Sequence, residues 1–245
     1  MKIIMTGCCS GIGAYVRQRL MEQGHQIVGI GLGGPDCKAD LSTTDGRDLA
    51  KYAMMNYASD AACLINNAGT TFIEKFENLY YKDLEKVFSV NFAAAFELTK
   101  YFMHARKASA HKDESDIYRV ICTTSMATVS ASRGSLAYVC SKAALEAMIA
   151  TLSREWAGKK PFMIMGVAPA WVFNTAIGSK VIDDYAKISG LTPEQNMQYA
   201  RSYSPMGRSC TMEEVWPLYD FAVNKAPIWM SGEIIRMPGG SGTIG

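Results

Sequence analysis

The stretch that decides the fold opens the chain and reads Lys2-Ile3-Ile4-Met5-Thr6-Gly7-Cys8-Cys9-Ser10-Gly11-Ile12-Gly13. Its first five residues after Met1 form an apolar run that predicts a buried strand, and residues 14–23 have the pattern of an amphipathic helix. The glycines lie between the two, where the lack of a Cβ lets another group approach the backbone closely. Backbone N–H groups at the start of a helix bind phosphate. We therefore interpret residues 6–13 as a phosphate-binding turn, and its candidate ligands are Gly7, Ser10, Gly11, Ile12 and Gly13.

The alternation of apolar runs and helical patterns continues along the chain. Further strands are expected at His25–Ile30, Cys37–Leu41, Cys63–Asn66, Tyr118–Thr124, Phe162–Val167 and Glu233–Met237. Helices are expected at about 44–58, 138–156, 176–188, 193–201 and 211–224, and two helical segments are expected between about 78 and 107. This order predicts an α/β protein with a single Rossmann-type, doubly wound parallel β-sheet of about seven strands and helices on both faces. Because no polar linker of the kind that separates domains interrupts the pattern, we expect one domain over residues 1–245.

The composition excludes several classes of protein. The 245 residues carry 25 Lys and Arg against 23 Asp and Glu, without the basic stripe of a nucleic-acid-binding protein. The longest nearly apolar stretch, Phe162–Phe173, is too short to cross a bilayer, and the first residues do not have the pattern of a signal peptide. We therefore expect neither nucleic acid nor a membrane as a partner.

Cysteines and histidines point to a reduced, metal-free interior. The seven cysteines are odd in number and form no C-x-x-C pair, which is typical of reduced thiols in a cytoplasmic protein. They lie in apolar segments, where we expect them to be core residues. The three histidines are far apart in the sequence, and we predict no metal site.

A second group of residues suggests acid–base chemistry. Tyr138 and Lys142 are spaced i, i+4 near the start of a predicted helix and project from one face, and Ser125 ends the strand before it. Oxidation of a secondary alcohol requires a base for its hydroxyl proton, and a free tyrosine, with a pKa of about 10, is a poor base at neutral pH. A lysine cation one turn away would lower that pKa, and a serine hydroxyl could hold the substrate oxygen. Taken alone, the Tyr–Lys spacing also fits a chance surface pair.

With these motifs in order over essentially its whole length, the chain resembles the short-chain dehydrogenases/reductases. Asn66-Asn67-Ala68-Gly69 resembles the signature of that family's fourth strand, and Pro169 opens the segment after its sixth strand. The resemblance implies an NAD(P)-dependent oxidoreductase that transfers a hydride between nicotinamide and a secondary alcohol or ketone. It also implies that Ser125, Tyr138 and Lys142 are catalytic, and that Asn91 holds a water beside the lysine.

The resemblance further implies the coenzyme contacts. They comprise the glycine turn, Asn67, Ala68, Gly69, Tyr138, Lys142, Pro169, Val172 and Thr175, with Asp40 and Leu41 beside the adenine. Gly31 stands where NAD-preferring members carry Asp, and no basic residue replaces it. Loss of a carboxylate removes the repulsion of a 2′-phosphate without adding attraction. The choice between NAD and NADP stays open here, with a lean toward tolerance of NADP.

The substrate side and the assembly are also inferred from the resemblance. Residues 25–30 and 39–43 are similar to bacterial 3α-hydroxysteroid dehydrogenases/carbonyl reductases, which suggests a hydrophobic or alicyclic, steroid-like substrate. A lid is expected at about residues 171–208, with apolar pocket candidates Trp171, Phe173, Ile177, Met197, Tyr199, Tyr203 and Met206. Alanine-rich helices at 92–107 and 138–156 match a family seam, so a homodimer or homotetramer is expected.

Two other functions remain open at this point. A non-catalytic dinucleotide sensor that binds a protein would share the fold, but such proteins usually lose the tyrosine or the lysine. An epimerase or dehydratase would keep the fold and the coenzyme, and would turn over without net change in nicotinamide absorbance.

Overall fold

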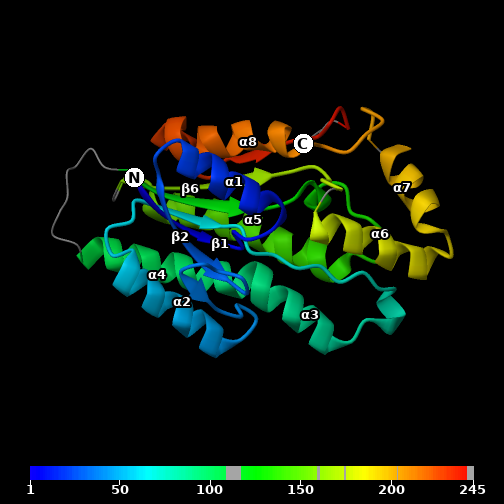
Figure 1. Ribbon diagram of the computed structural model, residues 1–245, viewed down its shortest axis with the longest axis horizontal. Helices are drawn as coiled ribbons and strands as arrows, with labels where there is room; N and C mark the ends of the chain where they lie inside the picture. The colour runs from blue at the N-terminus through cyan, green and yellow to red at the C-terminus, as the bar shows by residue number, and fades with distance from the viewer. Residues whose placement is uncertain (109–116, 159–160, 174, 203, 242–245) are drawn as a thin grey trace.

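Short apolar segments form one parallel sheet in the computed structural model, which describes residues 1–108, 117–158, 161–173, 175–202 and 204–241 (Figure 1). Within these residues the sheet has seven strands in the order β3-β2-β1-β4-β5-β6-β7, and every neighbouring pair is parallel. The strands are β1 (Lys2–Thr6), β2 (Gln26–Gly31), β3 (Cys37–Lys38), β4 (Cys63–Asn66), β5 (Tyr118–Thr123), β6 (Phe162–Ala168) and β7 (Ile234–Arg236). The predicted doubly wound α/β fold is confirmed.

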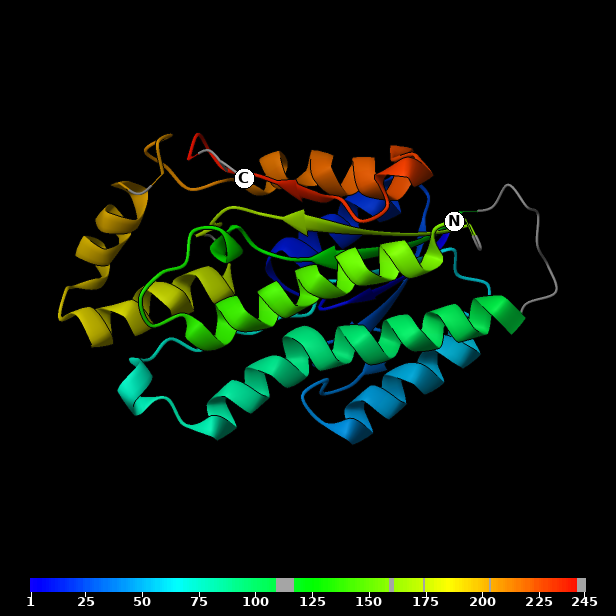
Figure 2. The same cartoon turned by 180° about the vertical axis from the view of Figure 1, so that it is seen from behind.

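Helices cover both faces of the sheet. The α-helices are α1 (Gly11–Glu22), α2 (Thr44–Tyr57), α3 (Tyr81–Phe88), α4 (Ala94–Ala108), α5 (Leu136–Trp156), α6 (Ala176–Ser189), α7 (Pro193–Ser202) and α8 (Met212–Asp220). Shorter turns are η1 (Phe76–Asn78), η2 (Ser89–Ala93), η3 (Met126–Thr128), η4 (Phe221–Lys225) and η5 (Ile228–Met230). Helices α1 and α8 lie on one face, α2, α4 and α5 lie on the other, and α6 and α7 extend beyond one end of the sheet (Figures 1 and 2).

The alternation of side chains along each strand divides the core in two. Ile4 of β1 and Leu64 of β4 pack with the helices α2, α4 and α5. Their neighbours Ile3 and Ile65 point to the opposite face and pack with α1 and α8. Successive side chains of a strand face opposite sides, and in a parallel sheet covered on both faces most of them are apolar. This is why the strands are continuous apolar runs in the sequence.

The strand order places a ligand site at one edge of the sheet. From β1 the chain builds outward through β2 and β3 in one direction, and through β4, β5, β6 and β7 in the other. The two directions diverge between β1 and β4, beyond whose carboxyl ends ligands bind in open α/β sheets. The turn from Gly7 to Ser10 follows β1 at this point.

Helix α5 is the one helix among the described residues that is long and apolar enough, by length and composition, to cross a membrane. It packs against β6 and α3, and its Leu145 and Ile149 are fully buried in the core.

Several local expectations need correction. Strand β3 ends at Lys38 rather than at Leu41, since Ala39 to Leu41 lead into α2. Helix α1 begins at Gly11, so the last two glycines of the turn belong to its first helical turn. Cys9 and Cys140 are exposed, although all seven cysteines were expected in the core.

Candidate active site

The backbone of the glycine turn has the positive φ angles and the close approaches that were expected from its glycines. Gly7 and Gly11 have φ angles of 64° and 51°, which favour glycine. A Cβ on Gly13 would lie 2.0 Å from the carbonyl oxygen of Gly7, so only glycine fits there. Ser10 is the N-cap of α1 but makes no side-chain hydrogen bond to the helix. The first N–H groups of α1 therefore have no side-chain cap, which fits a phosphate ligand.

A chain of hydrogen bonds joins the ends of β1, β4 and β5. The Thr6 hydroxyl oxygen accepts from the backbone N–H of Asn67 and of Ala68, each at 3.0 Å. Asn67 Nδ2 donates to the Gly7 carbonyl oxygen at 2.9 Å, and its Oδ1 accepts from the Thr123 hydroxyl at 3.2 Å. The Thr123 hydroxyl also contacts the buried Tyr219 hydroxyl at 2.6 Å. The position of the glycine turn is thus tied to the strands that carry the catalytic candidates.

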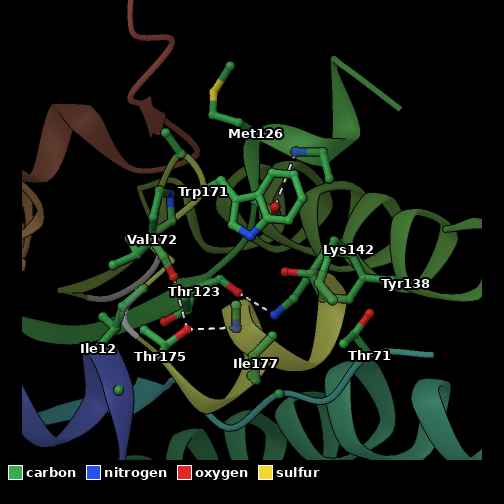
Figure 3. Close-up of a pocket in the computed structure, with 18 of the residues that line it drawn as sticks. Ile12, Thr71, Thr123, Met126, Tyr138, Lys142, Trp171, Val172, Thr175 and Ile177 are labelled. Carbon is green, nitrogen blue, oxygen red and sulfur yellow. Dashed lines mark hydrogen bonds between the residues drawn. The ribbon is translucent and has the colours of Figure 1, made fainter. Parts of the chain in front are cut away.

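The structure brings Ser125, Tyr138 and Lys142 together with the glycine turn. All three line one cavity of about 310 Å³ that is also lined by Gly7, Gly11 and Gly13. Ser125 follows β5 and caps η3, where its Oγ accepts from the Ala127 N–H at 3.1 Å. Tyr138 lies in the first turn of α5 and Lys142 in the next, with Nζ 5.9 Å from the centroid of the Tyr138 ring (Figure 3).

The electrostatics of Tyr138 differ from the expectation. Burial raises the pKa of the Tyr138 phenol, and a hydrogen bond with Ser125, not the charge of Lys142, opposes that rise. Burial also lowers the pKa of Lys142 to about 8. The Lys142 ammonium donates to the Thr123 carbonyl oxygen at 2.7 Å rather than to the phenol. The expected depression of the tyrosine pKa by the lysine is therefore not found, since burial raises that pKa and the Ser125 side chain is the group that opposes the rise.

Asn91 lies in η2, a π-helical turn between α3 and α4, and is buried. Its Oδ1 accepts from the Thr70 N–H, and its Nδ2 donates to the Thr70 carbonyl oxygen and to Ser141 Oγ. A Cβ on Gly69 would lie 3.5 Å from both Asn91 Oδ1 and Lys142 Nζ. Asn91 therefore lies near the lysine, while its side chain is held by protein groups.

Most of the predicted coenzyme contacts line the cavity. They are Gly7, Ser10, Gly11, Ile12, Gly13, Asn67, Ala68, Gly69, Pro169, Val172 and Thr175. Gly31, Asp40 and Leu41 are not among its lining residues, and the Asp40 carboxylate accepts from the N–H and hydroxyl of Ser42. Of the lid candidates, Trp171 and Ile177 line the cavity, whereas Phe173 is buried beside Trp171. Met206 is exposed, Met197 is not a lining residue, and Tyr203 and the Tyr199 side chain lie outside the described residues.

Three further residues line the cavity although no motif in the sequence marked them as site residues. Thr71, Ile73 and Tyr185 line the cavity, and the buried Thr71 hydroxyl has no hydrogen-bond partner in the described part of the chain. Thr71 and Ile73 follow the Asn66–Gly69 motif closely, and this proximity was the only available hint. Tyr185 comes from α6 and reaches the cavity through tertiary packing alone.

Comparisons with known proteins agree with this geometry. A family model described as short chain dehydrogenase matches residues 1–186. The chain is 28% identical to a 3-alpha-hydroxysteroid dehydrogenase/carbonyl reductase of Comamonas testosteroni, over 97% of this chain and 95% of the relative. It is 27% identical to a D-beta-hydroxybutyrate dehydrogenase of Cupriavidus necator, over 97% and 96% of the two chains. A Pseudomonas aeruginosa RhlG structure with NADP superposes with a TM-score of 0.79 at 27% identity, covering 98% of this chain and 95% of RhlG.

The chain belongs to the short-chain dehydrogenase family. Its members are NAD(P)-dependent oxidoreductases that act on CH–OH and C=O groups. The uncapped helix start and the close backbone approach in the glycine turn fit the coenzyme NAD(P).

The hydrogen bonds of Thr6 predict a difference between two substitutions. Thr6→Val removes the acceptor of two backbone N–H groups and should lower the free energy of unfolding by about 3 kcal/mol. Thr6→Ser keeps the hydroxyl and should cost about 1 kcal/mol for the lost methyl group. Urea unfolding measures both, and equal losses in the two variants would contradict this role of the hydroxyl.

The pKa of Lys142 predicts a pH dependence of stability. The native lysine releases its proton near pH 8, whereas the unfolded chain keeps it to about 10.5, so between these values the unfolded state binds more protons. The free energy of unfolding should therefore rise with pH across this window, by about 3 kcal/mol more in the wild type than in Lys142→Met. Urea unfolding from pH 7.5 to 10.5 measures the difference, with exposed Lys100→Met as the control that keeps the wild-type slope. Parallel curves for the wild type and Lys142→Met would rule out the shifted lysine.

Proposed function

We propose that this protein transfers a hydride between nicotinamide and a secondary alcohol or ketone at the cavity of Ser125, Tyr138 and Lys142. The observation that carries the proposal is that these three side chains line the same cavity as the glycine turn. The proposal treats residues 1–245 as one catalytic domain with a substrate lid at about 171–208. NAD(P), when bound, supplies the acceptor or donor of the hydride.

The roles of the side chains follow from their chemistry. In alcohol oxidation Tyr138 takes the hydroxyl proton as the hydride leaves the carbinol carbon, and in carbonyl reduction it returns that proton to the oxygen. Ser125 holds the same oxygen through its hydroxyl, which also contacts Tyr138. Lys142 provides a positive charge beside the phenol and a donor for the coenzyme ribose. Asn91 positions the segment around Gly69 beside the lysine and serves as the anchor of a proton relay.

The coenzyme contacts are assigned by the same proposal. Gly7, Ser10, Gly11, Ile12 and Gly13 bind the pyrophosphate, and Asn67, Ala68 and Gly69 line the path to the nicotinamide. Pro169, Val172 and Thr175 lie at the nicotinamide end. Gly31, Asp40 and Leu41 lie toward the adenosine. A 2′-phosphate meets no carboxylate at Gly31, which supports tolerance of NADP.

A hydrophobic or alicyclic, steroid-like substrate fits the cavity walls. Ile73, Met126, Trp171, Ile177 and Val181 line the cavity and are apolar. The 28% identity with the Comamonas testosteroni 3-alpha-hydroxysteroid dehydrogenase/carbonyl reductase also favours this substrate class. Apolar walls with a few convergent polar groups are typical of sites for such ligands.

Replacing Tyr138 by Phe tests the reaction. Loss of the acid–base group should lower kcat by about 10³-fold or more, while the dissociation constant of NADPH changes by less than about twofold. Absorbance at the reduced-nicotinamide band measures turnover of cyclic ketones and alcohols with both coenzymes, and quenching of tryptophan fluorescence measures binding. Tyr81→Phe, at a residue with 75% of its surface exposed, is the matched control. Near-normal turnover by Tyr138→Phe would reject the assignment.

We also propose a homodimer or homotetramer in the cytoplasm. Cys140, Ala143 and Ala147 form an exposed strip of small side chains along α5, and Phe96 of α4 is exposed. Small residues permit close approach of a second helix pair. The seven cysteines are free, which suits a reducing compartment.

The assembly predicts a mass at least twice that of the chain at micromolar concentration. Ala147→Glu would bury a charge in the seam and should shift the protein toward monomer, whereas Ala14→Glu on α1 serves as the control outside it. Sedimentation velocity measures both. A monomeric wild type would refute the seam.

A further inference from the structure

The cavity has an unusual charge composition for a site that must choose among hydroxy and keto compounds. Among the described residues that line it, Lys142 is the only basic side chain, and no carboxylate is present. The Lys142 ammonium is buried and already donates to the Thr123 carbonyl oxygen at 2.7 Å. A carboxylate on a substrate would therefore lose its hydration here without gaining an ion pair, which is strongly unfavourable.

One part of the cavity wall carries hydroxyl groups and no charged side chain. Ser132 and Ser135, from the loop before α5, and Tyr185 of α6 all line the cavity. Ser135 Oγ donates to the Ser132 carbonyl oxygen at 2.5 Å, and the side chains of both serines act to lower the pKa of the Tyr185 phenol. Burial raises the pKa of Tyr185, so its phenol keeps its proton and stays neutral. Because each hydroxyl has one donor and two acceptor lone pairs, the cluster keeps capacity for a ligand.

The cluster is held in place by three segments of the chain. The Glu74 N–H, after β4, donates to the Gly134 carbonyl oxygen at 3.0 Å. A Cβ on Gly134 would lie 2.6 Å from the Ile188 side chain, which shows how closely α6 covers the loop. Tyr185 itself packs against Trp171, with ring centroids 6.3 Å apart. Side chains held in this way form a preorganised wall.

Apolar groups surround the hydroxyl cluster. Trp171 and Ile177 lie over the same cavity as Tyr138 and Lys142 (Figure 3), and Ile73 and Val181 complete the wall. A ligand that reaches the cluster from Tyr138 must therefore pass along apolar surface. The favoured ligand has an apolar body with a polar, uncharged group at a second position.

We propose that Tyr185, Ser132 and Ser135 form a polar subsite that binds a second, uncharged hydroxyl or carbonyl group of the substrate and disfavours carboxylates. The inference rests on the proposed function for the place where the first oxygen binds. It adds the chemical class of substrate: a neutral apolar ketone or alcohol with a second hydroxyl or keto group.

A matched series of ketones tests the subsite. The probes are trans-2-decalone, its 6-hydroxy derivative and its 6-carboxy derivative, which differ only in the group at the second position. For the wild type, kcat/KM should be highest for the hydroxy ketone and at least about 100-fold lower for the carboxylate, because a buried carboxylate without a partner is costly.

Substitutions connect the preference to the cluster. In Tyr185→Phe, kcat/KM for the hydroxy ketone should fall about fivefold more than kcat/KM for the parent ketone, the size expected for one neutral hydrogen bond. Ser132→Ala should act in the same direction. Tyr81→Phe is the control that keeps the wild-type ratio, and thermal unfolding checks that each variant is folded.

Binding without turnover separates this inference from the proposed reaction. The three probes are titrated into Tyr138→Phe and into Tyr138→Phe/Tyr185→Phe, each with NADPH, and tryptophan fluorescence reports their dissociation constants. Tighter binding of the hydroxy ketone that is lost with Tyr185 supports the subsite even if no probe is turned over. A carboxy ketone that binds as tightly as the hydroxy ketone, or equal effects of Tyr185→Phe on the hydroxy and parent ketones, overturns it.

Discussion

The molecule depends on the hydrogen-bonded junction between the carboxyl ends of β1, β4 and β5. Thr6 accepts from the backbone of the segment after β4, and Asn67 bridges the glycine turn to Thr123. Thr123 in turn accepts from Lys142 through its carbonyl oxygen. A displacement of any one strand would therefore move the glycine turn relative to the lysine. Parallel strands allow this junction because all of their carboxyl ends meet at the same edge of the sheet.

Burial shifts the pKa values of the two titratable side chains at the carboxyl ends of the strands. It raises the pKa of Tyr138 and lowers that of Lys142, so in both residues the uncharged form is favoured. The Ser125 hydroxyl opposes the rise in the pKa of Tyr138, and Cys122 opposes the fall in the pKa of Lys142. The Lys142 ammonium also donates to the Thr123 carbonyl oxygen at 2.7 Å, and in a desolvated cavity such a bond has a larger effect than in water.

Much of the fold and of the candidate site could be predicted from the sequence, because their determinants are local. Strand positions followed from apolar runs, since each strand of a covered parallel sheet buries both faces. Tyr138 and Lys142 share a helix at spacing i, i+4, so their proximity needed no tertiary information. The spacing of the glycines indicated the turn after β1, Ser125 followed from its place at the end of a predicted strand, and the family resemblance added Asn91. The length of β3 and the start of α1 were missed, because strand pairing and helix capping decide such boundaries.

By itself the sequence determined the order of strands and helices, the glycine turn after the first strand and the pairing of Tyr138 with Lys142 on one helix face, because periodicity and short spacings are local properties of a chain. Only the tertiary structure decided the charge state and the walls of the cavity. Tyr138 and Lys142 are desolvated by segments distant in sequence, and this burial reversed the expected direction of the tyrosine pKa. Tyr185 meets Trp171 and the serine loop only because α6 folds back over the end of the sheet. Desolvation and long-range contact depend on which surfaces pack together, and no spacing along the chain encodes them.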